Sequence, residues 1–431
     1  MLIHVVQSGE TIQTIANYYE VSIERLVLDN GLYEPYNLVI GQCIVIVYPE
    51  LTYIVKEGDT LIDIANSYNV SIMQLLQNNS FLSDRDIQPG DIIVISYNKK
   101  GKITTHGNTV PYINKDTLRK TLPYLTYLSV LNYTATKEGD IIIYYDDTEI
   151  IQITKEYGTL PLMLLTTLTI EGTANIAISY DILLSEDFQN RQIVNILNIL
   201  RTKGYYGVNI SFQYISQLNL YLYENYLANI SKQLTKEGYL VFVTINPDII
   251  NVYNEVRFTQ VDYSILNQLA QNIIFMSYEW AANINPPSPI SSIYNLEVFL
   301  DYMNEYILPE KLVIGLATIG YDWELPYSAG FSSVNSMTLD RVIELARNKN
   351  AIIEFDEISQ TPFFTYTDNI NNNQIDHIVW FIDARSINSL LELVSKYELP
   401  GTNIWNITVY NTQLWLIINS QYEIVKVNES L

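Results

Sequence analysis

Four polar side chains stand out in the apolar stretch 204–215, namely Tyr206, Asn209, Ser211 and Gln213. The last three alternate with apolar residues, so in a strand they share one face. Side chains gathered on one face can bind a ligand or transfer protons to it. Proton transfer near neutral pH requires an ionisable group, and a carboxamide such as Gln213 forms hydrogen bonds but cannot deliver a proton. The stretch therefore predicts a strand that can contact a polar ligand but carries no general acid.

Histidine and cysteine are too few and too scattered for a metal centre. His4, His106, His377 and Cys43 have no spacing typical of metal ligands. The sequence also contains neither a Ser-His-Asp set nor a Gly-rich phosphate loop. A single cysteine cannot form an internal disulfide, and Cys43 is expected to be a small buried residue rather than a nucleophile. We therefore expect no structural metal and no cofactor.

Composition restricts the class of ligand. With 431 residues and 48% hydrophobic content, the chain can bury a large core. Its 47 acidic and 24 basic residues give a net charge of −23, which argues against nucleic acid and anionic membrane surfaces as partners. A neutral or cationic ligand fits better. The 35 tyrosines suit stacking on sugars and equally suit contacts between proteins.

The amino-terminal residues indicate neither export nor membrane insertion. They contain no basic leader and no long apolar run, so we expect no signal peptide and no membrane-spanning helix. The protein is accordingly expected to be made and kept in the cytoplasm, or released by lysis.

Residues 1–98 contain an internal repeat with a constant offset of 49 residues. An ungapped repeat of this length indicates duplication of a module. Each copy has the pattern strand, helix, helix, strand, and Thr11 and Thr60 are placed to cap the first helices. The sequence thus predicts two small α+β domains, residues 1–49 and 50–98. Paired positions include Gly9 and Gly58, Asn30 and Asn79, and Gly41 and Gly90.

Beyond the repeat, the hydrophobic pattern changes. Residues 99–110 are polar, contain glycine and a small basic cluster, and are typical of a linker. Residues 111–431 alternate short apolar strands with helices, which predicts an α/β fold, a parallel (β/α)8 TIM barrel. A longer spacing at about 321–378 predicts a small α+β insertion after the seventh strand. Expected strands include residues 127–133, 160–165, 207–212, 239–245, 273–278, 312–316 and 402–405.

The two repeats closely resemble LysM domains over residues 3–48 and 52–97. The resemblance rests on the Gly-Asp/Glu-Thr turn, the Ile-Ala-Asn-x-Tyr helix and the glycine before the last strand. LysM domains bind N-acetylglucosamine-containing glycans, namely peptidoglycan and chitin, in a shallow groove between two loops. The alternative is that these turn residues only cap helices. The sugar-contacting residues that the resemblance implies are Gly9, Thr11, Asn30, Gly58, Thr60 and Asn79.

From about residue 112 the chain resembles glycoside hydrolase family 18, and most of all the bacterial spore cortex-lytic N-acetylglucosaminidases and spore-germination hydrolases. The family's chemistry is substrate-assisted: a Glu on the fourth strand protonates the glycosidic oxygen, and an Asp two residues earlier orients the acetamide of the sugar. Here Gln213 and Ser211 occupy those two places, and Asn209 and Tyr206 replace two further Asp residues. Loss of the acid alone costs about 10²- to 10⁴-fold in rate, so the resemblance implies negligible hydrolysis. The matching segments are residues 118–127, 275–280, 314–323, 379–387 and 404–405.

Sugar binding can survive the loss of the acid. Gln213 can still form hydrogen bonds, Tyr278 matches the family tyrosine that contacts the acetamide, and Trp405 matches the aromatic floor under the reacting sugar. The alternative for Tyr278 and Trp405 is ordinary packing within the barrel. Acidic residues near the matching segments are expected to be hydrogen-bonding or surface residues rather than a replacement acid. They are Glu279, Asp322 and Asp383.

Three functions are compatible with this sequence. The first is a chitinase-like pseudoenzyme that binds peptidoglycan of the bacterial spore or cell wall, located in the mother cell and then at the spore coat or cortex surface. The second is an N-acetylglucosaminidase that remains active through an unrecognised acid. The third is a structural, self-associating protein of a spore coat or inclusion, with the barrel kept as a scaffold, because tyrosine-rich surfaces favour self-contact.

Overall fold

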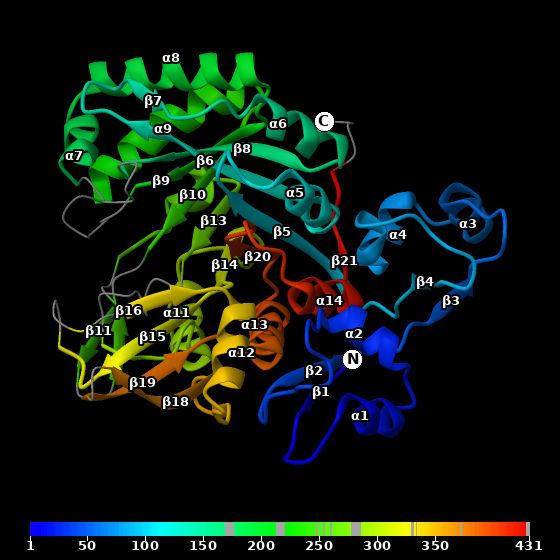
Figure 1. The fold of residues 1–431 in the computed structure, drawn as a ribbon. Helices are drawn as coiled ribbons and strands as arrows, with labels where there is room; N and C mark the ends of the chain where they lie inside the picture. Colours follow the sequence, from blue (N-terminus) through cyan, green and yellow to red (C-terminus); the bar gives the residue numbers. More distant parts are fainter. Residues whose placement is uncertain are drawn as a thin grey trace.

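The computed structural model describes residues 1–168, 176–212, 220–246, 249–252, 255–258, 261–276, 286–328, 332, 334–370 and 373–427. Two small amino-terminal modules lie against one side of a larger α/β domain (Figure 1). No helix in these described ranges is long and apolar enough to cross a membrane.

Each module is a two-stranded antiparallel sheet covered by two helices. Strand β1 pairs with β2, and β3 pairs with β4. The first helix of each module is capped as the repeat predicts, since Thr11 and Thr60 accept hydrogen bonds from the backbone N–H groups of Thr14 and Asp63. The first module comprises β1 (Leu2–Val5), α1 (Ile12–Tyr19), α2 (Ile23–Asn30) and β2 (Cys43–Ile46). The second comprises β3 (Leu51–Ile54), α3 (Leu61–Tyr68), α4 (Ile72–Asn78), the 3-10 helix η1 (Ser80–Ser83) and β4 (Ile92–Ser96).

Within the described residues, eight parallel strands close into a barrel. Each strand pairs with the next along the chain, and the last pairs with the first, which confirms the TIM-barrel prediction. The strands are β5 (Gly101–Thr109), β6 (Tyr127–Ala135), β8 (Leu160–Thr166), β9 (Gly207–Ser211), β10 (Leu240–Ile245), β13 (Asn272–Phe275), β14 (Leu312–Ala317) and β20 (Gly401–Trp405).

The segment predicted to be a linker is instead the first barrel strand. Residues 101–109 form β5, which lies between β6 and β20 and also pairs with β21 (Tyr422–Ile424). Its buried side chains include polar ones such as Thr105 and Asn108, so it lacks the apolar run by which the other strands were identified. Pairing on both edges stabilises it instead. Gly107 allows this close packing, because a Cβ there would lie 2.7 Å from a methyl carbon of Leu125.

Helices cover the outside of the barrel (Figure 1). The longest, α8 and α9, lie against β9 and its neighbours and bury one apolar face each. The barrel helices are η2 (Leu122–Tyr124), α5 (Lys115–Thr121), α6 (Thr148–Glu156), α7 (Ile176–Leu184), α8 (Glu186–Lys203), α9 (Leu220–Lys236), α10 (Leu266–Leu269), α11 (Ile293–Met303), η4 (Pro309–Lys311), α13 (Ala384–Lys396) and α14 (Thr412–Gln421). Short strands outside the barrel wall are β7 (Ile141–Ile143), β11 (Ile249–Val252) and β12 (Glu255–Phe258).

The predicted insertion is present between the seventh and eighth barrel strands. It is an antiparallel sheet, in the order β16-β15-β19-β18-β17, with α12 packed on one face. Because β15 begins three residues after β14 ends, the insertion rises directly from the carboxyl end of the barrel. Its elements are β15 (Gly320–Leu325), β16 (Val334–Met337), α12 (Leu339–Asn348), β17 (Glu354–Asp356), β18 (Thr361–Ile370) and β19 (Asn373–Trp380).

The barrel strands divide apolar residues between two cores. Outward-facing residues such as Val208 and Ile210 pack against the helices, while Leu162, Phe242 and their neighbours fill the barrel interior. His106 of β5 lies in this interior layer, 5.3 Å from the Phe242 ring, and is 1% exposed. Burial lowers the pKa of His106 to about 3, so the imidazole is a neutral part of the core near neutral pH.

Both modules dock on helix α14. Gln413 donates hydrogen bonds to Asn30 Oδ1 (3.0 Å) and to the carbonyl oxygen of Cys43 (2.9 Å) in the first module. Asn419, at the other end of α14, donates to the carbonyl oxygen of Gln77 (3.0 Å) and to Asn78 Oδ1 (2.8 Å) in the second. The modules and the barrel therefore share one continuous interface.

Candidate functional site

Strand β9 is the fourth strand of the barrel and directs its polar residues inward. Asn209 is 1% exposed; its Nδ2 donates to Ser129 Oγ (3.2 Å), and its Oδ1 accepts from Thr244 Oγ1 (2.8 Å). Strand β10, which pairs with β9, and strand β6, which lies beyond β8, therefore both hold this amide. Ser211 is the half-buried last residue of the strand. Gln213 lies outside the described residues.

Tyr206 lies at the other end of the same strand. It precedes β9, its backbone N–H donates to the carbonyl oxygen of Pro161, and its ring lies 5.6 Å from the ammonium group of Lys155 at the end of α6. In parallel barrels the active site lies at the carboxyl ends of the strands. Tyr206 therefore does not fill the mouth of the barrel, and the structure separates it from the other members of the motif.

None of the last residues of the eight barrel strands has a charged side chain. They are hydroxyl, aromatic and aliphatic residues, so these eight positions can donate and accept hydrogen bonds but include no carboxylate. The last residues of the eight strands are Thr109, Ala135, Thr166, Ser211, Ile245, Phe275, Ala317 and Trp405.

Trp405 ends β20 and is joined to Asn406 by a cis peptide bond. Its half-buried side chain packs at the edge of the main core. Below it, Asn108 of β5 donates to Asn403 Oδ1 (2.7 Å) and to the carbonyl oxygen of Ile404 (3.1 Å), which ties the first strand to the last. The structure thus places Trp405 at the carboxyl end, as expected, whereas Tyr278 lies outside the described residues.

A row of aromatic side chains in the insertion was not identified from the sequence. Tyr321, Trp380 and Phe363 are direct neighbours across β15, β19 and β18, and the Phe363 and Trp380 rings are 4.6 Å apart. They lie on the sheet face opposite α12, and Tyr321 and Trp380 pack, like Trp405, against the edge of the main core. The alternation of aromatic residues within these strands could have identified this row from the sequence.

The candidate replacement acids have structural partners. Asp322 is 5% exposed and is bonded to His377 Nδ1 (2.9 Å) and Tyr366 Oη (2.7 Å) on the α12 face of the insertion. Asp383 caps α13, accepts from the backbone N–H of Arg385 (2.8 Å) and pairs with the Arg385 side chain (2.7 Å). Both carboxylates are therefore held by structural partners. Glu279 lies outside the described residues.

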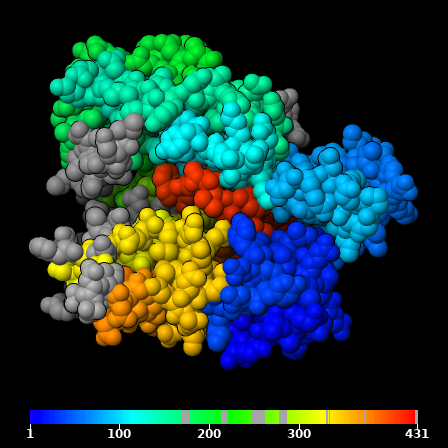
Figure 2. All heavy atoms as spheres, in the orientation of Figure 1, coloured from blue at the N-terminus to red at the C-terminus, as the bar shows by residue number. Residues whose placement is uncertain are grey.

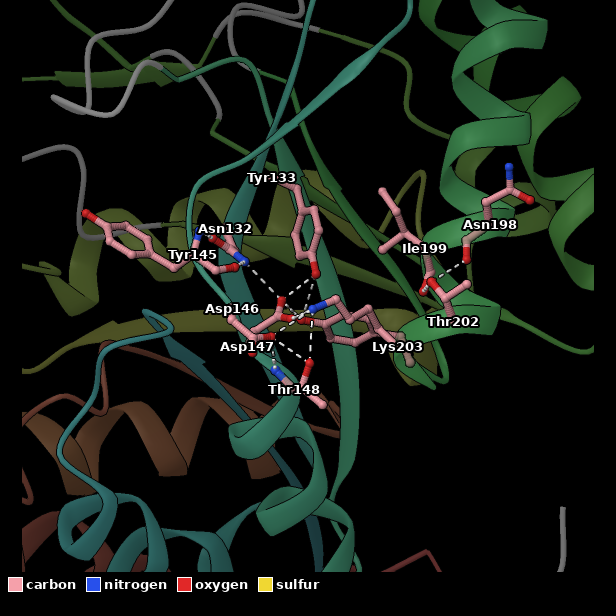
Figure 3. Close-up of polar contacts among 11 residues, drawn as sticks. Asn132, Tyr133, Tyr145, Asp146, Asp147, Thr148, Asn198, Ile199, Thr202 and Lys203 are labelled. Carbon is pink, nitrogen blue, oxygen red and sulfur yellow. Dashed lines mark hydrogen bonds and ion pairs between the residues drawn. The ribbon is translucent and has the colours of Figure 1, made fainter.

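A further buried carboxylate, Asp147, forms a closed cluster between β6, α6 and the end of α8 (Figure 3). The side chain is 0% exposed; its Oδ2 accepts from Tyr133, Tyr205 (2.7 Å) and Asn132 (3.0 Å), and Lys203 Nζ lies 3.1 Å from Oδ1. Burial raises the pKa of Asp147, but the donated hydrogen bonds outweigh it and hold the pKa below its ordinary value. This ionised, enclosed carboxylate joins three elements and has no proton to deliver.

Cys43 is buried, as predicted. Its Sγ lies 3.1 Å from Asp383 Oδ2, and burial raises the pKa of the thiol, so it remains a thiol near neutral pH. No group of three or more His, Cys, Asp or Glu side chains in the described part of the chain could hold a metal ion.

The first turn of each module is exposed and braced by one carboxylate. Gly9 and Gly58 have φ values of 83° and 86°, and Thr11 and Thr60 follow them at the surface. The hydroxyls of Thr11 and Thr60 cap helices, so both residues have a structural role that does not depend on a sugar ligand. The braces are Glu10, bonded to His4 (2.9 Å) and to the Gln7 N–H (2.6 Å), and Asp59, bonded to Tyr53 (2.7 Å) and to the Lys56 N–H (2.8 Å).

The expectation that the side chains of Asn30 and Asn79 contact sugar needs correction. They are 6% and 1% exposed, and each bridges the end of the second helix to the closing strand. Asn30 exchanges hydrogen bonds with both backbone groups of Val45, and Asn79 does the same with Val94. Buried amides must be paired, and here the backbone supplies the partners. The polar groups of both side chains therefore already have partners within their own modules.

Comparison with known proteins shows likeness along the whole chain. The family model described as "Glycosyl hydrolases family 18" matches residues 108–409, and the LysM domain model matches residues 4–47 and 53–96. The chain is 35% identical over 436 residues to the cortical fragment-lytic enzyme of Bacillus subtilis, covering 99% of both chains. It is 31% identical over 431 residues to the enzyme of the same name from Bacillus anthracis, covering 98% of both.

Solved structures also match the chain along almost its whole length. The crystal structure of the spore cortex-lytic enzyme SleL from Bacillus megaterium matches with a TM-score of 0.80 and 27% identity, over 99% of both chains. SleL from Bacillus cereus matches with a TM-score of 0.80 and 26% identity, over 99% of this chain and 98% of that one. The likeness thus includes both modules, the barrel and their arrangement.

Proposed function

The chain belongs to glycosyl hydrolase family 18 and carries two LysM domains, and from this premise we propose that it binds N-acetylglucosamine-containing glycans of the bacterial spore or cell wall without hydrolysing them. The observation that carries the proposal is strand β9, where Asn209 and Ser211 stand in place of the carboxylates expected from the resemblance. Both are neutral, and the Asn209 amide is already bonded to Ser129 and Thr244.

The chemistry of hydrolysis explains the negative half of this proposal. Family 18 hydrolysis needs a proton for the leaving oxygen and a carboxylate to orient the acetamide of the sugar. Gln213 cannot supply the proton, and Ser211 supplies only a hydroxyl. Asp147, Asp322 and Asp383 are engaged elsewhere in the fold. Removal of a general acid costs about 10²- to 10⁴-fold in rate even when every other group is retained.

The positive half rests on aromatic and exposed polar groups. Trp405 stands at the carboxyl end of the last strand, and Tyr321 and Trp380 lie at the base of the adjoining insertion. Aromatic faces complement the apolar faces of sugar rings, and neutral hydroxyl and amide groups match sugar hydroxyls. The exposed turns at Gly9 and Gly58 add the loops through which LysM domains contact glycans.

The relatives suggest where this binding takes place. They are named cortical fragment-lytic and spore cortex-lytic enzymes, and they match this chain from end to end. We therefore place the chain at the spore cortex or coat, with peptidoglycan as its partner. The net charge of −23 agrees with a polymer that is not strongly anionic.

Sedimentation of the intact chain with purified spore peptidoglycan tests the binding half. We expect most of the protein in the pellet and release by soluble chitin oligosaccharides. A chain that stays in the supernatant would remove the basis of the proposal.

Mass spectrometry of cortex fragments incubated with the chain tests the absence of hydrolysis. We expect no released sugars, under conditions in which the Bacillus subtilis relative is the positive control. Turnover that is abolished by Glu279→Gln would show that this chain is an enzyme with an alternative acid.

A further inference from the structure

A cleft lies between the two modules, the insertion and the last βα loop of the barrel. Its volume is about 1040 Å³, at the upper end of the range of about 300–1,000 Å³ for ligand pockets. Residues 30–34 of the first module, η1 of the second, α5 and α12 form its walls, and residues 408–413 form its floor. Figure 2 shows this floor in red, recessed between the cyan α5 region, the yellow α12 region and the blue modules.

The cleft runs between the modules and the carboxyl end of the barrel. One end is lined by the second loop of each module, at residues 30–34 and at Ser80 and Phe81. The other end reaches Thr408, whose backbone N–H donates to Asn406 Oδ1 (3.1 Å), next to Trp405. A single extended ligand could therefore follow the cleft from the modules toward the carboxyl end of β20.

The aromatic lining of the cleft suits a sugar polymer. The Tyr33 side chain is 85% exposed, and Phe81 and Tyr410 line the same space. Tyr33 stands in the first module where Leu82 stands in the second, so the repeat does not require an aromatic residue at this position. A rigid aromatic face that no core contact explains is available for stacking.

The charges of the cleft disfavour anionic ligands. Its basic residues are each engaged by an acid: Lys120 by Asp84, Arg341 by Glu344, and Arg347 by Glu34 at 3.9 Å. The acidic residues that line the cleft also include Asp116, Asp340 and Asp383. The lining is therefore net negative, which disfavours phosphate-bearing ligands and acidic peptides and is compatible with a neutral or cationic one.

We propose that this cleft binds a neutral N-acetylated glycan strand and guides it from the LysM modules to the mouth of the barrel. The proposal rests on the glycan-binding function above and adds a third contact surface between the two kinds of domain. A strand that spans the cleft engages the modules and the barrel at once, so its affinity rises with chain length by effective concentration.

Calorimetric titration of the full chain with short and long chitin oligosaccharides tests this path. Tyr33→Ala should weaken binding of long oligosaccharides about tenfold, as expected when an interface loses one aromatic anchor worth about 1.4 kcal/mol. Tyr36→Ala is the matched control, because Tyr36 is 83% exposed on the same loop but does not line the cleft. Thr117→Trp, which fills the space from the α5 wall, should reproduce the effect of Tyr33→Ala.

Weakening by Tyr33→Ala and Thr117→Trp but not by Tyr36→Ala supports the cleft. Unchanged binding in all three variants, or equal weakening by Tyr33→Ala and Tyr36→Ala, overturns the cleft and leaves the proposed glycan binding intact. Absence of any binding by the unmodified chain, to oligosaccharides and to peptidoglycan, overturns both proposals.

Discussion

The two amino-terminal modules share one backbone plan but are fitted to different neighbours. Gly41 and Gly90 occupy the same position in the repeat and have φ values of 86° and 95°. A Cβ at Gly90 would meet nothing within 4 Å, whereas a Cβ at Gly41 would lie 2.0 Å from the carbonyl oxygen of Ile353 in the insertion. Gly90 is therefore needed only for the turn in the second module. Gly41 is needed both for the turn in the first module and for its close contact with the insertion.

Other paired positions differ in the same way. Asp29 of the first module pairs with Arg25 at 2.7 Å, while its counterpart Asn78 accepts a hydrogen bond from Asn419 of α14 at 2.8 Å. The amides that hold helix to strand, Asn30 and Asn79, are unchanged between copies. Duplication thus preserved the interior of the module, where any change costs stability, and left the outer faces free to adapt to the barrel.

The largest effect is expected from alanine at the paired glycines. Gly90→Ala places an L side chain at positive φ and should cost about 1–2 kcal/mol of unfolding free energy. Gly41→Ala adds overpacking against Ile353, about 1–3 kcal/mol more, and should separate the first module from the insertion. Urea unfolding and limited proteolysis of both variants measure the difference. Equal destabilisation of the two would show that the Ile353 contact contributes nothing.

An intermediate effect is expected on the docking helix. Asn419→Ala removes a 1% exposed amide that bonds Gln77, Asn78 and Lys99, and should cost about 2–3 kcal/mol because buried partners lose their hydrogen bonds. Gln413→Ala, at the less buried contact with the first module, should cost about 1 kcal/mol.

Hydrogen exchange identifies which module responds. Amides of α4 should lose protection in Asn419→Ala, and those of α2 in Gln413→Ala. Loss of protection in both modules from either change would mean that they dock as one unit.

The smallest effect concerns pH and the braced turns. The hydrogen bond from the Gln7 N–H lowers the pKa of Glu10, and that from the Lys56 N–H lowers the pKa of Asp59. A lowered folded-state pKa means that each brace is complete above the ordinary carboxyl pKa and is lost as the pH falls through the folded value. The Gln7 and Lys56 amide resonances should therefore titrate below the ordinary pKa of each carboxyl group.

Carboxamide variants serve as controls for that titration. Glu10→Gln and Asp59→Asn should each abolish the titration in their own module only. Titration of either amide at or above the ordinary carboxyl pKa would contradict the role of the backbone hydrogen bond.

Features set by local pattern were predictable from the sequence. The 49-residue offset identified the two modules, and the caps at Thr11 and Thr60 followed from residue type and place. Alternating apolar strands and helices identified the barrel and the position of its insertion. The spacing of hydrophobic residues, turn glycines and helix caps all depend on a few neighbouring residues, so they can be recognised without a structure.

Features set by distant partners were not predictable. Strand β5 was assigned to a linker because its polar residues are stabilised only by β6 and β20, which are far away in the chain. Asn30 and Asn79 were assigned to sugar because nothing in the repeat shows that Val45 and Val94 already bind their amides.

The polar stretch 206–213 has one property that was predictable from the sequence and others that were not. The sequence by itself determined that the strand carries no acid, because protonation chemistry belongs to the residue type. Only the tertiary structure decided that Asn209 is fixed by Ser129 and Thr244, that Tyr206 lies at the opposite end from the mouth, and that Asp322 and Asp383 are bound elsewhere. Position and hydrogen-bond partners depend on how the barrel closes, and closure is a property of the whole chain.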